Sequence, residues 1–163
     1  MDRSQLLRLM PRDKKDVEGA RKIVDLGLPA AAPVLPDMIR CLRVHGSEVA
    51  SEFAALLANQ PEHCWQHINR ELTFGRDDDI KYVIVASIIA KWPVDWLGKI
   101  AGSLQMALTH TSFHETDLLC IDLLERHALC DRSWLKSWLD FKMGRLSKHV
   151  ALAQSIASRF DGP

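Results

Sequence analysis

The stretch VEGARKIVDLGLP, residues 17–29, ends in a proline, and its helical pattern returns twice along the chain with different residues. Its counterparts are EVASEFAALLANQP, residues 48–61, and YVIVASIIAKWP, residues 82–93, so Pro29, Pro61 and Pro93 are spaced by 32 residues. A proline is tolerated in the first turn of a helix, where its missing N–H would have no partner, and it discourages continuation of the helix before it. The recurrence therefore predicts a repeated unit made of a helix, a turn with proline and a second helix.

Apolar residues recur at helical spacing in every long segment, and no segment alternates with the period of a strand. An isolated helix pair cannot bury its apolar faces, so repeated pairs have to stack. We therefore expect an all-α protein, an α-solenoid of about four antiparallel helix pairs and a C-terminal capping helix. The expected helices cover residues 16–27, 34–44, 47–59, 62–74, 78–91, 94–109, 115–128, 132–143 and 146–160. The expected units are 14–45, 46–75, 76–110 and 111–144, with a cap at 145–163, within a single domain 1–163.

Local signals place several helix ends. Asp16, Ser47 and an aspartate of the run RDDD, residues 76–79, are suited to cap helix starts, and Gly27, Gly46 and Gly75 are suited to turns. Pro33 and Pro36 predict that the second helix of the first unit begins late, near Pro33 or after it, with Pro36 still in its first turn. The helix at 78–91 is apolar on nearly all sides and should be the most buried.

Composition limits the class of protein. The 163 residues include 47% apolar and 26% charged residues, a balance typical of a globular domain. Lys and Arg together number 21, as do Asp and Glu, so the formal net charge is zero. Because affinity for phosphates comes mainly from concentrated positive charge, we expect no nucleic-acid partner.

The chain shows no signs of export or of a membrane span. Its first residues, MDRSQLLRLMPRDKKD, are charged throughout, and its longest apolar run is far shorter than the ~20 residues that cross a bilayer. Four cysteines, Cys41, Cys64, Cys120 and Cys130, lie in or beside apolar helical patterns without a CxxC pair, which favours free core thiols. We expect a cytoplasmic protein with no membrane partner.

Histidine pairs at helical spacing, His63 with His67 and His110 with His114, can place two imidazoles on one helix face, as many zinc sites do. Neither pair belongs to an HExxH motif, and surface or capping roles are the simpler interpretation, although metal binding by either pair stays open. Serine elbows, glycine-rich phosphate loops and recognisable triads are missing from the sequence. We therefore expect no metal, no cofactor, no catalytic residue and no enzymatic activity.

Two further features have both a structural and a functional interpretation. The run GRDDDIK, residues 75–81, can begin a helix, where aspartates suit the dipole, or can bind a cation or a basic partner. The five tryptophans, a high number for this length, suit either a core or an exposed protein interface. These tryptophans are Trp65, Trp92, Trp96, Trp134 and Trp138.

Several of these residues carry a resemblance to a small bacterial family of HEAT-like helical domains of unknown function. The family's opening motif of leucine, proline, lysine or arginine, aspartate and lysine corresponds to Met10 to Lys14 with Asp16 here. A leucine-glycine turn and an aspartate pair leading into an apolar helix with lysine and tyrosine also match. That second match uses Asp78, Asp79, Lys81 and Tyr82. The match covers residues 5 to 95. Relatives carry a tryptophan and a proline before the third helix, where this chain has HGSEV, and they carry a tryptophan before the Lys-Tyr pair that this chain lacks. The resemblance implies a right-handed HEAT-like solenoid.

The resemblance also implies a functional class, because similar genes often occur in toxin and immunity loci of interbacterial competition systems. We therefore expect an immunity-type protein that binds a cognate toxin or effector and occludes it. The partner-binding residues we expect are the charged positions of the second helices and the acidic turn, namely Asp37, Arg40, Arg43, Arg70, Glu71, Asp77, Asp78 and Asp79. The alternatives are a general HEAT-like interaction scaffold and a HEAT-like enzyme of the DNA-glycosylase type. The sequence leaves the oligomeric state open.

Overall fold

The computed structural model describes residues 1–109 and 115–160, and over these residues the chain consists of helices and turns without a strand. The expected all-α class is confirmed for this part of the chain. The chain forms two compact units, Met1–Leu129 and Cys130–Pro163, and each is described by itself.

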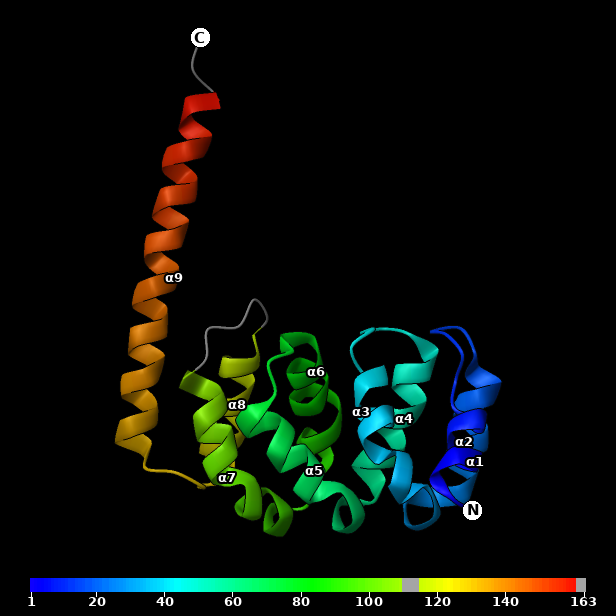
Figure 1. Cartoon of the computed structure of the whole chain (residues 1–163). Coiled ribbons are helices and arrows are strands. Elements are labelled where there is room, and N and C mark those ends of the chain that lie inside the picture. The colour runs from blue at the N-terminus through cyan, green and yellow to red at the C-terminus, as the bar shows by residue number, and fades with distance from the viewer. Residues whose placement is uncertain (110–114, 161–163) are drawn as a thin grey trace. The chain divides into compact units, whose positions relative to one another are not determined.

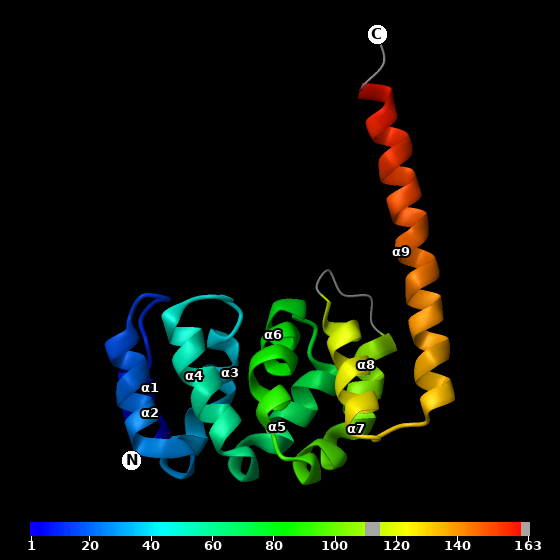
Figure 2. The same cartoon turned by 180° about the vertical axis from the view of Figure 1, so that it is seen from behind.

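One row of helices in the first unit is formed by the segments expected as the first helices of the repeated units. Each of these segments packs on the next along the chain, as the view from behind shows (Figure 2). The row consists of α2 (Val17–Ala31), α4 (Glu48–Asn59), the continuous segment α6 (Asp78–Val83), η2 (Ile84–Ile88) and η3 (Ile89–Lys91), and α8 (Thr116–Arg126).

A second row faces the viewer in Figure 1. In this row α3 packs on α5 and α5 packs on α7, while the N-terminal α1 packs on η1. Its members are α1 (Arg3–Leu9), η1 (Ala32–Val34), α3 (Leu35–Cys41), α5 (Pro61–Phe74) and α7 (Val94–Thr109).

The expected capping residues act as predicted. The side chains of Asp16, Ser47 and Asp77 accept hydrogen bonds from the backbone N–H groups of Gly19, Ala50 and Ile80, at 3.0, 3.1 and 3.1 Å. These bonds satisfy N–H groups that have no partner inside the helix, and they define the starts of α2, α4 and α6.

The proline-rich stretch interrupts the helix where the sequence indicates. Gly27 has φ 73°, which kinks α2, and the N–H of the following Leu28 donates to Gln60 Oε1 at 3.1 Å. Pro36 lies in the first turn of α3, which begins at Leu35, and Pro61 begins α5. The late start of the second helix is thereby confirmed. Gly75 ends α5 with φ −60°, so this turn does not use the left-handed conformation that Gly27 adopts.

The core of the first unit lies between the two rows. Phe53 and Leu57 of α4 and Ile84 and Ile88 of η2 are fully buried, and each such side chain contributes about 1.5–3 kcal/mol by burial. The segment 78–91 is the buried helix expected, but residues 84–88 form a π turn and residues 89–91 a 3-10 turn. The indole N–H of Trp92, which follows this segment, donates to the buried carbonyl of Leu57 at 3.3 Å.

The first helix, α1, was not expected. Asp2 accepts from the N–H of Gln5 at 2.8 Å, and the Gln5 side chain accepts from the N–H of Asp2 at 3.0 Å. This reciprocal capping box begins a seven-residue helix whose Leu6 is fully buried.

The second unit contains α9 (Arg132–Phe160), a single continuous helix of 29 residues. The expectation of two helices, 132–143 and 146–160, is therefore wrong, and the expected boundary between residues 144 and 145 falls inside α9. Gly144 lies inside the helix and has open space around it. The helix continues through it because a single glycine lowers helix stability without ending a helix.

Candidate functional site

The charged positions of α3 are joined to α1. Arg3 contacts Asp37 at 2.8 Å and donates to the carbonyl of Pro33 at 3.2 Å, and Arg40 contacts Asp37 at 2.8 Å. The Asp37 side chain is only 17% exposed, so two arginines compensate its charge. Asp37 therefore holds α1 against α3, whereas Arg40, at 73% side-chain exposure, remains accessible to a partner.

The remaining acidic candidates lie at the turn between α5 and α6. Asp77 caps α6 and also forms an ion pair with Arg43, at 3.1 Å between Nε and Oδ2. Next to this pair the ring of His45 meets the ring of Tyr82 edge to face, at 5.2 Å between centroids. These contacts bring the turn after α3 and the turn before α6 side by side, although 34 residues separate Arg43 from Asp77.

The end of α5, three residues before Asp77, exposes an apolar side chain. Phe74 is 74% exposed, the highest value among the exposed large apolar residues of the described chain. The next residue, Gly75, donates its N–H to the Glu71 carbonyl at 2.8 Å, and a Cβ at Gly75 would collide with Glu71. The chain therefore turns tightly after Phe74.

We call this region the turn surface and define it as Arg43, Val44, Phe74, Asp77 and Asp78. Val44 is also an exposed apolar residue, and Asp78 lies in the first turn of α6. Of the other expected residues, Arg70 is exposed on the last turns of α5, while Glu71 and Asp79 are half-buried. The structure thus joins Arg43 to the acidic turn through Asp77. Asp37 and Arg40 instead form a separate group of ion pairs with Arg3.

An aromatic cluster joins α5 to α7. The rings of Trp65 and Trp96 lie 6.4 Å apart, and the ammonium of Lys99 lies 3.6 Å from the Trp96 centroid and 5.7 Å from that of Trp65. Both tryptophans are half-buried. Lys99 was not among the expected residues, although its position three residues after Trp96 on a helix places the two on one face.

Hydrogen bonds hold the same two helices in register. Ser103 of α7 donates to Asn69 Oδ1 at 2.6 Å and lies 2.7 Å from the Thr73 hydroxyl, while Thr73 donates to the Asn69 carbonyl at 2.8 Å. Because these groups are partly buried, their pairing favours one relative position of α5 and α7. The second row therefore forms a firm support for the turn surface.

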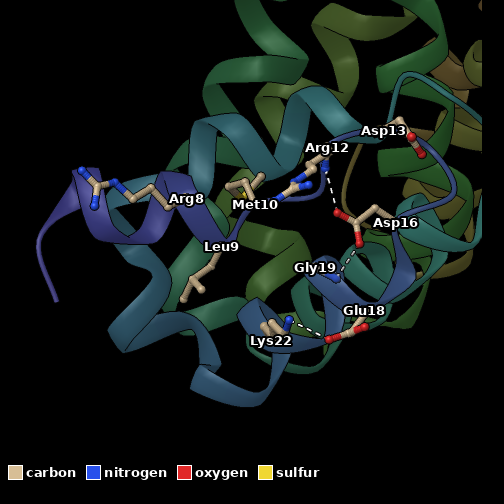
Figure 3. A pocket seen from close by; sticks show the side chains of 9 residues that line it. All are labelled: Arg8, Leu9, Met10, Arg12, Asp13, Asp16, Glu18, Gly19 and Lys22. Atoms are coloured by element: carbon tan, nitrogen blue, oxygen red, sulfur yellow. Dashed lines mark hydrogen bonds and ion pairs between the residues drawn. The ribbon is translucent and has the colours of Figure 1, made fainter.

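The opening motif of the chain builds the turn between α1 and α2 (Figure 3). Asp16 accepts from the backbone N–H groups of Arg12 and Gly19, each at 3.0 Å, and these bonds hold the pKa of its carboxyl below the ordinary value. A Cβ at Gly19 would lie 2.8 Å from Asp16 Oδ2, so a larger residue would displace the carboxylate that caps α2. The adjoining cavity, of about 360 Å³, is lined by Arg8, Leu9 and other residues of this turn. The motif therefore has a structural role.

The lysine and tyrosine of the other matched motif are also placed by packing. Lys81 is 5% exposed and lies near Cys120 of α8, while Asp117 of α8 is 6% exposed. Tyr82 meets His45, as described above. The hydroxyl of Thr116 at the start of α8 is buried and has no hydrogen-bond partner in the structure. This interior cluster supports the packing of α6 on α8.

The metal and thiol candidates show no assembled site. Within residues 1–109 and 115–160, no group of three or more His, Cys, Asp or Glu residues is arranged to hold a metal ion. His63 lies 3.7 Å from Glu62, and the Cys64 thiol donates instead to the carbonyls of Leu57 and Gln60, both at 3.4 Å. The pair His110 and His114 lies outside the described residues.

All four cysteines are free, and Cys64 and Cys120 are buried while Cys41 and Cys130 are half-buried. Burial disfavours the thiolate and raises the pKa of both Cys64 and Cys120 to about 12. It also raises the pKa of Cys41. These thiols are therefore poor nucleophiles at neutral pH.

Comparison of the chain with protein-family profiles, with curated proteins and with solved structures gave no match. Among the helices of the described residues, none has both the length and the apolar character needed to cross a membrane.

Proposed function

We propose that the chain is an immunity-type protein that binds a cognate bacterial toxin or effector and occludes it. Its first unit would be a right-handed HEAT-like solenoid of antiparallel helix pairs, with the turn surface as the centre of the interface. The toxin class rests on the sequence resemblance, whereas the surface itself rests on the contacts described above.

The repeated packing supports the solenoid. Successive first-row helices contact one another from α2 to α8, and α3, α5 and α7 do the same in the second row. Because the repeated prolines fall at or near the same junction of each unit, one supersecondary unit can recur along the chain. Such stacks offer extended surfaces that cover a partner without performing chemistry on it.

The exposure of Phe74 is the single observation that carries the binding proposal. A large aromatic residue projecting from a firmly held turn can fill a pocket on a partner at a small cost in side-chain entropy. Asp77, three residues further along the chain, forms an ion pair with Arg43, so this turn also offers a guanidinium and carboxylates to a partner. An apolar centre with a charged rim is the usual organisation of a protein interface.

The acidic turn favours a partner with a positively charged surface. The carboxylates of Asp77, Asp78 and Asp79 lie together before and within the first turn of α6. A toxin whose active-site cleft is basic, as in nucleases, would be attracted to this turn and its approach accelerated. Salt should therefore slow association more than it speeds dissociation.

The test is co-expression with the product of a toxin gene directly preceding this gene. We expect the chain to relieve the growth arrest that the toxin causes. Phe74→Asp should abolish protection and weaken binding of the purified toxin by about thirtyfold or more, as expected for loss of a hot spot. Calorimetric titration measures this change.

Val94→Asp provides the matched control. Val94 is also an exposed apolar residue, but it begins α7, where an aspartate suits the helix dipole. This variant should protect as the original chain does. Growth arrest unrelieved by the original chain would contradict the toxin assignment, and equal protection by Phe74→Asp would contradict the turn surface.

A further inference from the structure

Positive charge is concentrated on α9. Between residues 132 and 154 the helix carries five basic residues, Arg132, Lys136, Lys142, Arg145 and Lys148, and one acidic residue, Asp140. Residues 1–129 carry fifteen basic and eighteen acidic residues. The neutral total therefore conceals an acidic first unit and a strongly basic helix.

The same helix exposes apolar side chains. Phe141, Val150 and Leu152 are 56%, 55% and 57% exposed, and Leu139, Met143 and Leu146 are also exposed. Solvent-exposed apolar residues are ordinary when they are scattered singly. Six of them within fourteen residues of one helix form a surface that requires a partner.

Aromatic rings extend this surface toward the start of α9. Trp134 meets Trp138 edge to face at 6.1 Å, and Trp138 meets Phe141 in the same way at 5.7 Å. The guanidinium of Arg145 lies 6.0 Å from the Phe141 ring. Tryptophan is enriched where proteins meet the boundary between lipid tails and headgroups, and helices that lie in this boundary combine Trp, Phe and Leu with Lys and Arg.

The positions of these residues around the helix distinguish between partners. At ~100° per residue, Trp134, Trp138, Phe141 and Leu152 form one apolar strip, and Leu139, Met143, Leu146 and Val150 form another. Lys142 lies between the two strips, and Arg145 lies within the first strip beside Phe141. A groove in a protein accepts one strip of anchors at helical spacing. A lipid surface accepts both strips, because long basic side chains can extend to the phosphates.

We propose that α9 lies on the surface of an anionic phospholipid bilayer, with both apolar strips in the headgroup boundary and its basic side chains on lipid phosphates. Charge complementarity selects this partner over a second copy, because two copies of residues 132–154 side by side would bring ten basic residues together against two acidic ones. The helix would lie along the surface without spanning it. This proposal replaces the expectation of no membrane partner, which rests on the lack of a spanning segment and does not extend to a helix at the interface.

Co-sedimentation of the full chain with lipid vesicles tests this proposal. We expect binding to vesicles of phosphatidylserine mixed with phosphatidylcholine, little binding to phosphatidylcholine alone, and release by high salt. The triple variant Lys136→Glu, Arg145→Glu and Lys148→Glu should lower the partition coefficient by about a hundredfold, since each basic residue near such a surface adds about fivefold. Phe141→Asp with Leu152→Asp should lower it as well.

A matched triple variant in the first unit, Lys14→Glu, Lys15→Glu and Lys91→Glu, makes the same change in net charge and should lower binding far less. Circular dichroism of each variant checks that helix content is retained. The proposal is overturned by failure to bind anionic vesicles, or by equal loss of binding in the two triple variants. It is also overturned if equilibrium sedimentation shows a dimer that the α9 variants convert to a monomer, because a second copy would then cover the helix.

Discussion

Phe53 and Phe141 both lie in helices, yet Phe53 is fully buried in α4 while Phe141 is 56% exposed on α9. The contrast holds for the surrounding residues. In the first unit the large apolar side chains of short helices meet between two rows, and in the second unit one long helix leaves most of its own in solvent. Apolar residues therefore stabilise the first unit and are available for binding in the second.

Truncation of a buried side chain should have the largest effect. Phe53→Ala should lower the free energy of unfolding by about 3–5 kcal/mol, because it removes apolar burial and leaves a cavity. Leu146→Ala in α9 should change it by less than about 0.5 kcal/mol, since Leu146 is exposed. Urea denaturation followed by circular dichroism measures both changes. Equal losses of unfolding free energy in the two variants would contradict the difference in burial between the two units.

Two glycines offer a smaller and opposite pair of effects. Gly27 adopts φ 73°, so Gly27→Ala should cost about 1–2 kcal/mol through strain in the left-handed region. Gly144 is helical and has open space around it, so Gly144→Ala should stabilise α9 by about 0.5–1 kcal/mol. Thermal unfolding of the two variants, compared with the original chain, should show shifts of opposite sign. A higher unfolding temperature for Gly27→Ala would contradict the left-handed conformation of Gly27.

The buried thiols predict a pH effect confined to the first unit. Because the folded-state pKa of Cys64 and Cys120 is raised from 9.0 to about 12, neutral thiols favour the folded state. This contribution is complete below pH 9 and is lost as pH rises toward 12, by about 1 kcal/mol for each thiol near pH 10. Cys64→Ala should therefore lose stability less steeply above pH 9 in urea titrations. An unchanged slope would indicate that Cys64 ionises freely in the folded protein.

Much of the first unit could be predicted from local sequence. Prolines and capping residues determine helix boundaries within a few residues of their own positions, so a short segment is enough to predict each boundary. This applies to Pro29, Pro61 and Pro93 and to the caps Ser47 and Asp77. The helix α1 was missed although Asp2 and Gln5 form a capping box that the sequence displays. The π turn at Ile84 is a local departure from α-helical geometry that a search for regular helical periodicity did not reveal.

The second unit and the surface contacts depended on other information. The helices expected at 132–143 and 146–160 are one helix, because a helix continues when no competing turn is stabilised. The pair Arg43 and Asp77 and the approach of Lys99 to Trp65 join residues far apart in the chain, so their geometry required the packing of whole helices. Residue type identified several members of the turn surface, while Phe74 was found only through its exposure.

Amide hydrogen exchange measured along the chain compares the two units most directly. We expect the amides of α4 to exchange only through global unfolding, and those of α9 between Leu139 and Leu152 to exchange at least about a hundredfold faster through local opening. This difference should narrow when anionic vesicles are added and α9 is held on a surface. Equal protection of α4 and α9 in the absence of vesicles would contradict the division of the chain into a stable core unit and an exposed binding helix.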